Sequence, residues 1–343
     1  MMKKIYVDTF QIRTKYKDTA VSKLVKRTID ELLLRGDVNV SSIGDHIENR
    51  HWLMLTRFFL SLRYQVLVVS NPNTLIPPWH AYITFHDVIP YERAKGWKRK
   101  MFAFQYRLWV MSAAKVYTFS HEIKEKLENI LGRPEDKIKV VPFHLHEAYI
   151  SLADRQQVPP KKNYVLGFGT GEPRKNLQRT LAMFSEIYTL NPEMELYLFG
   201  NNWAEKGYDL VNELLAEYPL RDRVRHFYKI SLDELIQLYS EAQLFLFPSL
   251  SEGVGAPPFE AVASGTKVIL SDIGIFKELF SGYKNVFFIT LKDSSGDKNI
   301  LKRALEDPFD TADYLHIKKH KLKYSVDIMA EDMLYGTKNL TGE

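Results

Sequence analysis

Two glutamates, Glu252 and Glu260, stand eight positions apart on either side of a turn rich in glycine and proline. The apolar run at 244–248 predicts a buried strand before them, and 259–263 predicts the first turns of a helix that begins after proline. A strand, a glycine turn and a helix N-terminus present backbone N–H groups that suit a phosphate. Because carboxylates accept hydrogen bonds from hydroxyl groups, the element predicts a nucleotide-sugar site.

Two adjacent cations, Arg174 and Lys175, precede another predicted helix. Cations at a helix N-terminus oppose the helix dipole, so a bound anion accounts for them better than solvent does. The alternative is a solvated basic pair that has no ligand.

A histidine, His86, follows the predicted strand at 81–85 and is itself followed by Asp87. Ligands of open parallel sheets bind at the carboxyl ends of the strands, so His86 is a candidate for the site. The alternative is a structural histidine. Ser120 ends another predicted strand, but its position before a helix is more typical of an N-cap.

Short apolar runs alternate with helical patterns along the whole chain, which predicts parallel α/β sheets. The expected organisation is an N-terminal Rossmann-like domain over 1–153, a polar linker over 154–162, a second Rossmann-like domain over 163–324 and a C-terminal helix over 325–343. Two such domains would place a ligand in the cleft between them.

Three segments carry a resemblance to a known family. They are GTGEPRKN (169–176), LYSEAQLFLFPSLSEGVGAPPFEAVASG (238–265) and VILSDIGIFKEL (268–279). These resemble the C-terminal domain of the GT4, or group 1, retaining glycosyltransferases of the GT-B fold. Weaker likeness continues in the N-terminal half through VDTFQIR, FHDVIP and TFSHEIKEKL. The resemblance implies two Rossmann-like domains facing across a cleft, with the C-terminal helix crossing back to the N-terminal domain.

The resemblance also implies roles for the charged residues. Lys175 contacts the donor diphosphate and Arg174 lies beside it, where fixed cations stabilise the charge of a departing nucleotide. Glu252 binds the donor sugar or orients its anomeric carbon, and Glu260 accepts hydrogen bonds from the ribose. A first-turn carboxylate that complements the helix dipole remains an additional interpretation of Glu260.

Two further roles follow from the same resemblance. The backbone of Gly253, Val254 and Gly255 lines the sugar-phosphate site, since glycine allows a close approach. His86 touches the donor sugar and, with Glu252, forms the predicted catalytic pair. The sequence departs from many relatives in having no glycine pair near the start, where 14–20 reads TKYKDTA, so the geometry of the first loop is not implied.

No metal and no cofactor are expected besides the nucleotide-sugar co-substrate. The chain has no Asp-x-Asp pair, which removes the diphosphate-metal clamp used by another glycosyltransferase fold. His144 and His146 lack a further ligand cluster, so zinc is not expected either. The chain also has no cysteine, which excludes disulfides and thiol nucleophiles.

The function expected is retaining transfer of a hexose from a nucleotide sugar, either GDP-mannose-like or a UDP- or dTDP-sugar. The acceptor would be a glycan or a lipid-linked glycan in the synthesis of surface polysaccharide or glycoconjugate. The mechanism implied by the resemblance is front-face displacement, in which the departing diphosphate accepts the acceptor proton. The alternative is a catalytically silent GT-B partner or a sugar-nucleotide-binding protein.

A mildly basic chain with net charge +5 is compatible with several anionic partners. Residues 94–115 combine cations with aromatic residues and no acids, which predicts either a peripheral contact with the membrane or a helix that packs on the sheet. The apolar segment 50–60 predicts a buried core helix. Nucleic acid is not expected. With no signal peptide and no long apolar run, the expected location is cytoplasmic, at or near the inner face of the membrane.

Overall fold

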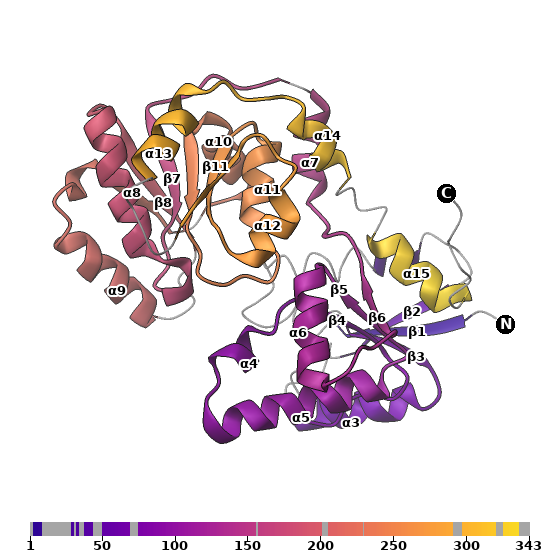
Figure 1. The fold of residues 1–343 in the computed structure, drawn as a ribbon. Coiled ribbons are helices and arrows are strands. Elements are labelled where there is room, and N and C mark those ends of the chain that lie inside the picture. Colours follow the sequence, from indigo (N-terminus) through magenta and orange to yellow (C-terminus); the bar gives the residue numbers. More distant parts are fainter. Residues whose placement is uncertain are drawn as a thin grey trace. The chain divides into compact units, whose positions relative to one another are not determined.

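The computed structural model describes residues 3–8, 29–30, 32–33, 38–43, 50–68, 75–155, 157–200, 205–228, 230–290, 297–319 and 325–335. The chain forms two compact units (Figure 1). The first unit comprises Met1–His144 with Leu322–Glu343, and the second comprises Leu145–Lys321. The segment 14–20, which bears on the expected first loop, lies outside the described residues.

The first unit contains a six-stranded parallel sheet in the order β2-β1-β3-β4-β5-β6. Strands β3, β4 and β5 are buried over nearly their whole length, as is typical of parallel strands covered by helices. The strands are β1 (Lys3–Asp8), β2 (Val38–Ile43), β3 (Gln65–Val68), β4 (Tyr82–Phe85), β5 (Lys115–Thr118) and β6 (Ile138–Val140), and the helices are α3 (Arg50–Ser61), α4 (Ile89–Arg93), α5 (Gly96–Ser112), α6 (His121–Leu131) and α15 (Ser325–Tyr335).

Helix α15 packs on the sheet of the first unit although it lies near the C-terminal end of the sequence. The buried Asp332 carboxylate accepts hydrogen bonds from Tyr117 Oη at 3.1 Å and from Lys139 Nζ at 3.2 Å. Tyr82 Oη donates to the Asp332 carbonyl oxygen at 3.2 Å. Burial, together with the charge of Asp332, raises the pKa of Tyr82, so this phenol stays a donor. The C-terminal helix therefore completes the unit built by the N-terminal half.

The second unit contains a six-stranded parallel sheet in the order β12-β11-β10-β7-β8-β9. The strand order reverses between the neighbours β7 and β10, which makes the edge beyond their carboxyl ends a topological switch point. The strands are β7 (Tyr164–Phe168), β8 (Glu195–Phe199), β9 (Val224–Phe227), β10 (Leu244–Phe247), β11 (Lys267–Ser271) and β12 (Val286–Ile289). The helices are α7 (Glu147–Arg155), α8 (Leu177–Leu190), α9 (Glu205–Ala216), α10 (Leu232–Glu241), α11 (Ala256–Ala263), α12 (Gly274–Phe280), α13 (Asp297–Glu306) and α14 (Asp313–Lys318).

The boundary between the units lies at His144 and not at the expected 153, because α7 packs against α11 and α14 of the second unit. The polar segment expected to be a linker is also attached to that unit. Tyr314 Oη donates to the carbonyl oxygen of Gln157 at 3.1 Å. Lys161 Nζ donates to backbone and side-chain oxygens of the same unit, at 2.8 and 2.9 Å.

Residues 50–60 form the predicted helix, α3, but the prediction that this helix is buried in the core holds for one face only. Helix α3 buries Leu53 and Arg57, and Arg57 forms an ion pair with Asp8 at the end of β1. In contrast, Trp52 and Phe59 expose 66% and 64% of their surface. The helix carries apolar residues on both faces, but only one face lies against the sheet.

Candidate active site

Two loops meet at the switch point of the second sheet. One follows β7 and passes through the 3-10 turn Pro173–Lys175 into α8, and the other follows β10 and leads into α11. Leu250 N donates to the Arg174 carbonyl oxygen at 2.8 Å, and Asn176 Nδ2 donates to the Pro248 carbonyl oxygen at 3.2 Å. Asn176 has a φ of 56°, a left-handed conformation that Asn tolerates well. These contacts fix the two loops to each other.

The paired loops bring together two cations and one carboxylate. Lys175 Nζ and Arg174 Nη1 both lie 2.7 Å from the same oxygen, Oε1 of Glu252. Lys175 is 6% exposed and Glu252 is 7% exposed, so the contact is buried. The Lys175 ammonium also lies 4.7 Å and 4.5 Å from the ring centroids of Phe168 and Phe247, at cation–π distance.

Burial and the neighbouring charges shift the pKa values of this cluster. Burial alone would raise the pKa of Glu252, but Lys175 and Arg174 outweigh burial and lower that pKa, so the carboxylate is ionised. Burial lowers the pKa of Lys175, and the nearby Arg174 adds to this effect, while Glu252 offsets it in part. Two cations therefore share one buried carboxylate, and a second, more exposed carboxylate, Glu172, pairs with Arg174.

Glu172 is a second carboxylate partner of Arg174. Its Oε1 accepts a hydrogen bond from Arg174 Nε at 2.6 Å, and its backbone carbonyl accepts one from Lys175 N at 2.9 Å. Glu172 and Glu252 together outweigh burial and raise the pKa of Arg174. Sequence reasoning missed Glu172, although it lies inside the GEPRKN motif, and it missed the two phenylalanines around Lys175.

The start of α11 fits the expected glycine turn with one revision. Gly255 has a φ of 76°, and a Cβ at this position would lie 2.6 Å from Phe276, so only glycine fits without strain. Gly255 caps α11 without a side-chain hydrogen bond, and Val254 is buried. Pro257 and Pro258 occupy the first turn and carry no N–H group. The backbone N–H groups that could bind an anion are therefore those of the loop before α11. The second and third residues of the helix are the two prolines and supply no N–H group.

Glu260 lies one turn into α11, where it contacts a buried tyrosine. Tyr239 Oη donates to Glu260 Oε2 at 3.4 Å. Burial raises the pKa of Tyr239 well above its ordinary value, and the charge of Glu260 adds to the shift, so the phenol stays protonated. The ribose role of Glu260 remains a prediction.

His86 belongs to the first unit, whereas the other predicted site residues belong to the second. It follows β4 directly and is half-buried, with its ring centroid 5.2 Å from that of Phe119. Asp87 Oδ1 accepts a hydrogen bond from Ile89 N at 3.0 Å, which fixes the turn into α4. The sugar contact of His86 remains a prediction. Ser120 is an N-cap as expected, because its Oγ accepts from Ile123 N at 3.2 Å.

A histidine near the switch point was also missed by sequence reasoning. His226, on β9, has its Nε2 3.0 Å from the Gly169 carbonyl oxygen, and its ring centroid lies 4.0 Å from that of Tyr228. A Cβ at position 169 would lie 2.8 Å from His226 Nε2, so glycine leaves room for the imidazole. Burial lowers the pKa of His226, which keeps its ring neutral.

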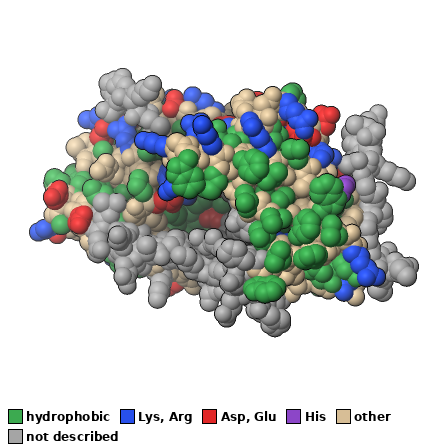
Figure 2. Space-filling model, turned by 90° about the horizontal axis from the view of Figure 1, so that it is seen from below, with side chains coloured by type: hydrophobic (Ala, Val, Ile, Leu, Met, Phe, Trp, Pro, Cys, Tyr) green, Lys and Arg blue, Asp and Glu red, His purple; other side chains and the backbone are tan. Residues whose placement is uncertain are grey.

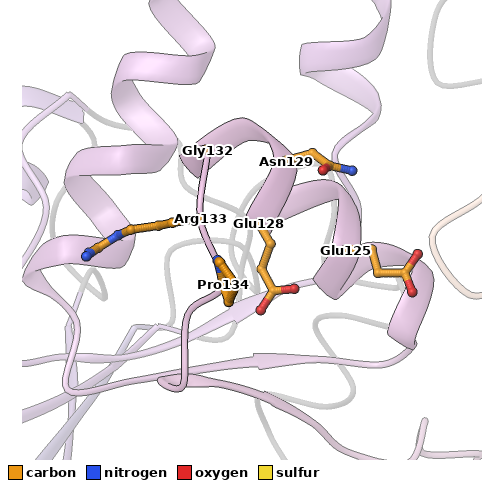
Figure 3. A pocket seen from close by; sticks show the side chains of 6 residues that line it. All are labelled: Glu125, Glu128, Asn129, Gly132, Arg133 and Pro134. Atoms are coloured by element: carbon orange, nitrogen blue, oxygen red, sulfur yellow. The ribbon is translucent and has the colours of Figure 1, made fainter.

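One hollow on the described surface shares no residue with this cluster. It has a volume of about 490 Å³, lies at the end of α6 and is lined by Glu125, Glu128, Asn129, Gly132, Arg133 and Pro134 (Figure 3). Its polar groups are used locally, because Glu128 accepts from Glu135 N at 3.0 Å and Arg133 forms an ion pair with Glu135. In the part of the chain that the structure describes, His, Asp and Glu side chains form no cluster of three suited to a metal ion.

Comparisons with known proteins agree with this geometry. The family model described as "Glycosyl transferases group 1" matches residues 151–322. The O-antigen chain mannosyltransferase RfbU of Salmonella typhimurium strain LT2 is 28% identical over 262 residues, which cover 75% of this chain and 70% of RfbU. The serotype-specific mannosyltransferase WbdA of Escherichia coli is 25% identical over 264 residues, which cover 72% of this chain but only 31% of WbdA.

Among solved structures, WaaG, a glycosyltransferase involved in lipopolysaccharide biosynthesis, superposes with a TM-score of 0.69 at 14% identity. The match covers 97% of this chain and 100% of WaaG. Two α/β units with parallel Rossmann-like sheets and this likeness establish the GT-B fold. The chain belongs to the group 1 glycosyl transferases.

Proposed function

We propose that this glycosyltransferase is a retaining, metal-independent hexosyltransferase that uses a nucleotide-sugar donor. The observation that carries the proposal is the pair of cations, Arg174 and Lys175, sharing one buried carboxylate where β7 and β10 end. A diphosphate would replace the Glu252 carboxylate as the partner of these cations. As the glycosidic bond breaks, the departing diphosphate gains charge, and preorganised cations stabilise it without solvent reorganisation.

Binding of the diphosphate would release Glu252 from its two cations. Its carboxylate would then accept hydrogen bonds from hydroxyls of the donor sugar, while the backbone of Gly253, Val254 and Gly255 approaches the sugar phosphate. Glu260 would accept hydrogen bonds from the ribose hydroxyls. The hydrogen bond from Tyr239 would hold the Glu260 carboxylate in place. His86 of the first unit would contact the transferred sugar.

In the proposed reaction the bond from the anomeric carbon to the phosphate oxygen breaks, and a bond from that carbon to the acceptor oxygen forms on the same face. The proton of the acceptor hydroxyl passes to the departing phosphate oxygen. No enzyme nucleophile is required, and the anomeric configuration is retained. Arg174 and Lys175 would stabilise the diphosphate charge that a metal ion stabilises in other transferases, so neither a metal nor a cofactor is needed.

We favour GDP-mannose as the donor, over UDP- and dTDP-sugars, because two of the relatives described above are named as mannosyltransferases. The acceptor would be a glycan or a lipid-linked glycan in the synthesis of surface polysaccharide or glycoconjugate. No helix of the described residues is long and apolar enough to cross a bilayer. The proposed location is the cytoplasm, with peripheral attachment at the inner face of the membrane, and no partnership with nucleic acid is proposed.

A donor panel tests the proposal. GDP-, UDP- and dTDP-sugars are offered to the wild-type protein, to Lys175→Met and to Lys162→Met, while thermal shift and nucleotide release are measured. Lys162 is a matched control, since its ammonium forms an equally short ion pair at 2.7 Å with Glu241 but is 62% exposed. We expect one donor to stabilise the wild type and the control but not Lys175→Met. A shift without nucleotide release for any acceptor would favour a silent sugar-nucleotide-binding protein, and no shift with any donor would refute the proposal.

A further inference from the structure

A buried phenol lies beside Glu260, the carboxylate that we assign to the ribose. Tyr149, on α7, is 1% exposed, in contrast to the hydrophobic side chains that gather on the surface of the first unit in Figure 2. Its Oη has no hydrogen-bond partner among the described residues. A buried hydroxyl that makes no hydrogen bond destabilises a fold, so its presence needs an explanation. The ligand-free protein therefore keeps one buried hydrogen-bond donor unused next to the candidate site.

Packing contacts place Tyr149 close to Glu260. Helix α7 packs against α11, which carries Glu260 (Figure 1). The ring of Tyr149 meets the ring of Tyr239 edge-on, with centroids 6.3 Å apart and an angle of 71° between the planes. Tyr239 Oη in turn donates to Glu260 Oε2 at 3.4 Å. The two phenols are thus neighbours, and one of them already reaches the carboxylate.

The charge of Glu260 acts on both phenols. Burial raises the pKa of Tyr149, and the Glu260 carboxylate adds to the shift, as it does for Tyr239. Both phenols therefore stay protonated and can donate to a carboxylate. His146, whose ring centroid lies 6.4 Å from that of Tyr149, uses its Nδ1 to accept a hydrogen bond from Ala148 N at 3.1 Å. Glu260 is therefore the acceptor towards which the Tyr149 hydroxyl can turn.

We propose that Tyr149 is a positioning residue, which donates a hydrogen bond to Glu260 when the ribose of the donor is bound. A carboxylate accepts about four hydrogen bonds. Tyr149 and Tyr239 would supply two of them from the interior of the second unit, and the two ribose hydroxyls would supply the others. A carboxylate held in this way loses less freedom when the nucleoside binds. The inference rests on the proposed function, because it requires that Glu260 contacts the ribose.

The proposal predicts different effects on stability and on binding. Tyr149→Phe removes a buried hydroxyl that has no partner, so the Tm of the ligand-free protein should not fall. The matched control is Tyr314→Phe, because Tyr314 is also 1% exposed but its Oη donates to the Gln157 carbonyl oxygen at 3.1 Å. The control should melt at a lower temperature than the wild type and bind nucleotide as the wild type does.

Nucleotides without ribose hydroxyls test whether Tyr149 acts through the ribose contact. Calorimetry measures the binding of GDP and 2′,3′-dideoxy-GDP, with UDP and its dideoxy analogue in parallel, to the wild type and both variants. We expect Tyr149→Phe to bind the ribonucleotide about tenfold more weakly and the dideoxy nucleotide less than about twofold more weakly. In transfer assays its donor KM should rise while kcat changes little.

Three results would overturn the inference while leaving the proposed function intact. The first is equal affinity of the wild type and Tyr149→Phe for the ribonucleotide. The second is an equal loss of affinity for the ribonucleotide and the dideoxy nucleotide, which indicates a structural role. The third is a fall in Tm for Tyr149→Phe as large as that for Tyr314→Phe. If the wild type binds neither GDP nor UDP, the proposed function fails and the inference fails with it.

Discussion

Replacing Glu252 by glutamine should destabilise the ligand-free protein while making it respond more strongly to GDP. The substitution keeps the shape of the side chain but removes the only negative charge shared by Lys175 and Arg174 inside the site. Breaking a buried ion pair by removing one partner costs about 3–5 kcal/mol, because the other charge is left uncompensated. The glutamine oxygen still accepts a hydrogen bond, so the expected loss is about 3 kcal/mol.

For a unit of this size that loss corresponds to a fall in Tm of about 6–12 °C, measured by calorimetry or dye-based melting. The matched control is Glu241→Gln, which alters an ion pair of the same 2.7 Å length with the exposed Lys162. Exposed pairs contribute about 0–1 kcal/mol, so the control should melt within about 4 °C of the wild type. Transfer activity of Glu252→Gln should fall at least about a hundredfold, since a group that contacts the reacting sugar is lost.

The response of Tm to GDP and the pH dependence of stability test the same variant in two further ways. A nucleoside diphosphate brings the missing negative charge, so GDP should raise the Tm of Glu252→Gln by more than it raises that of the wild type. Because the folded pKa of Glu252 lies below its ordinary value, its stabilisation is fully present above that value and is lost as pH falls through the lowered pKa. The difference between wild type and variant should therefore vanish in acid. Equal melting at neutral pH, or an equal response to GDP, would refute the reasoning about the shared carboxylate.

Three other substitutions address separate features. Gly255→Ala should destabilise by about 1–3 kcal/mol, because it strains a φ of 76° and places a methyl group against Phe276; thermal melting checks this, and an unchanged Tm would contradict it. Tyr239→Phe removes one hydrogen bond to Glu260, so donor KM should rise a few-fold while kcat changes little; a fall confined to kcat would argue against the ribose role. Burial lowers the pKa of Lys161 to about 7. Above that pH the unfolded protein binds more protons than the folded protein, so the free energy of unfolding of the wild type should rise from about pH 7 towards 10. Denaturant titrations of Lys161→Met should lack this rise.

The sequence predicted the elements of the second unit well because its signals are local. The apolar run at 244–248 is β10, and the helix expected over 259–263 is α11, which begins slightly earlier because proline fits a first helical turn. The contact between Lys175 and Glu252 could not be predicted from the sequence. Those residues are 77 positions apart, and they meet only because β7 and β10 are neighbours in the sheet without being consecutive in sequence.

Two predictions were wrong because the same sequence pattern is compatible with more than one packing of the helix. Residues 50–60 are apolar around most of the helix, which usually indicates burial, yet Trp52 and Phe59 face solvent. Likewise, α7 follows the N-terminal half without a strong break, and only its packing on α11 and α14 assigns it to the second unit. In both cases a helix was recognised, but the surface on which it packs depends on distant parts of the chain.

The position of α15 sets an order for the folding of the two units. Its bonds to Tyr82, Tyr117 and Lys139 span 250, 215 and 193 residues, so they cannot form until almost the whole described chain has left the ribosome. The second unit is a continuous insertion between the parts of the first, and every residue it needs is available earlier. Closing so long a loop also delays folding, because non-local contacts form last. The unit whose synthesis begins first is therefore completed last, and its sheet lacks its final helix until α15 has been synthesised.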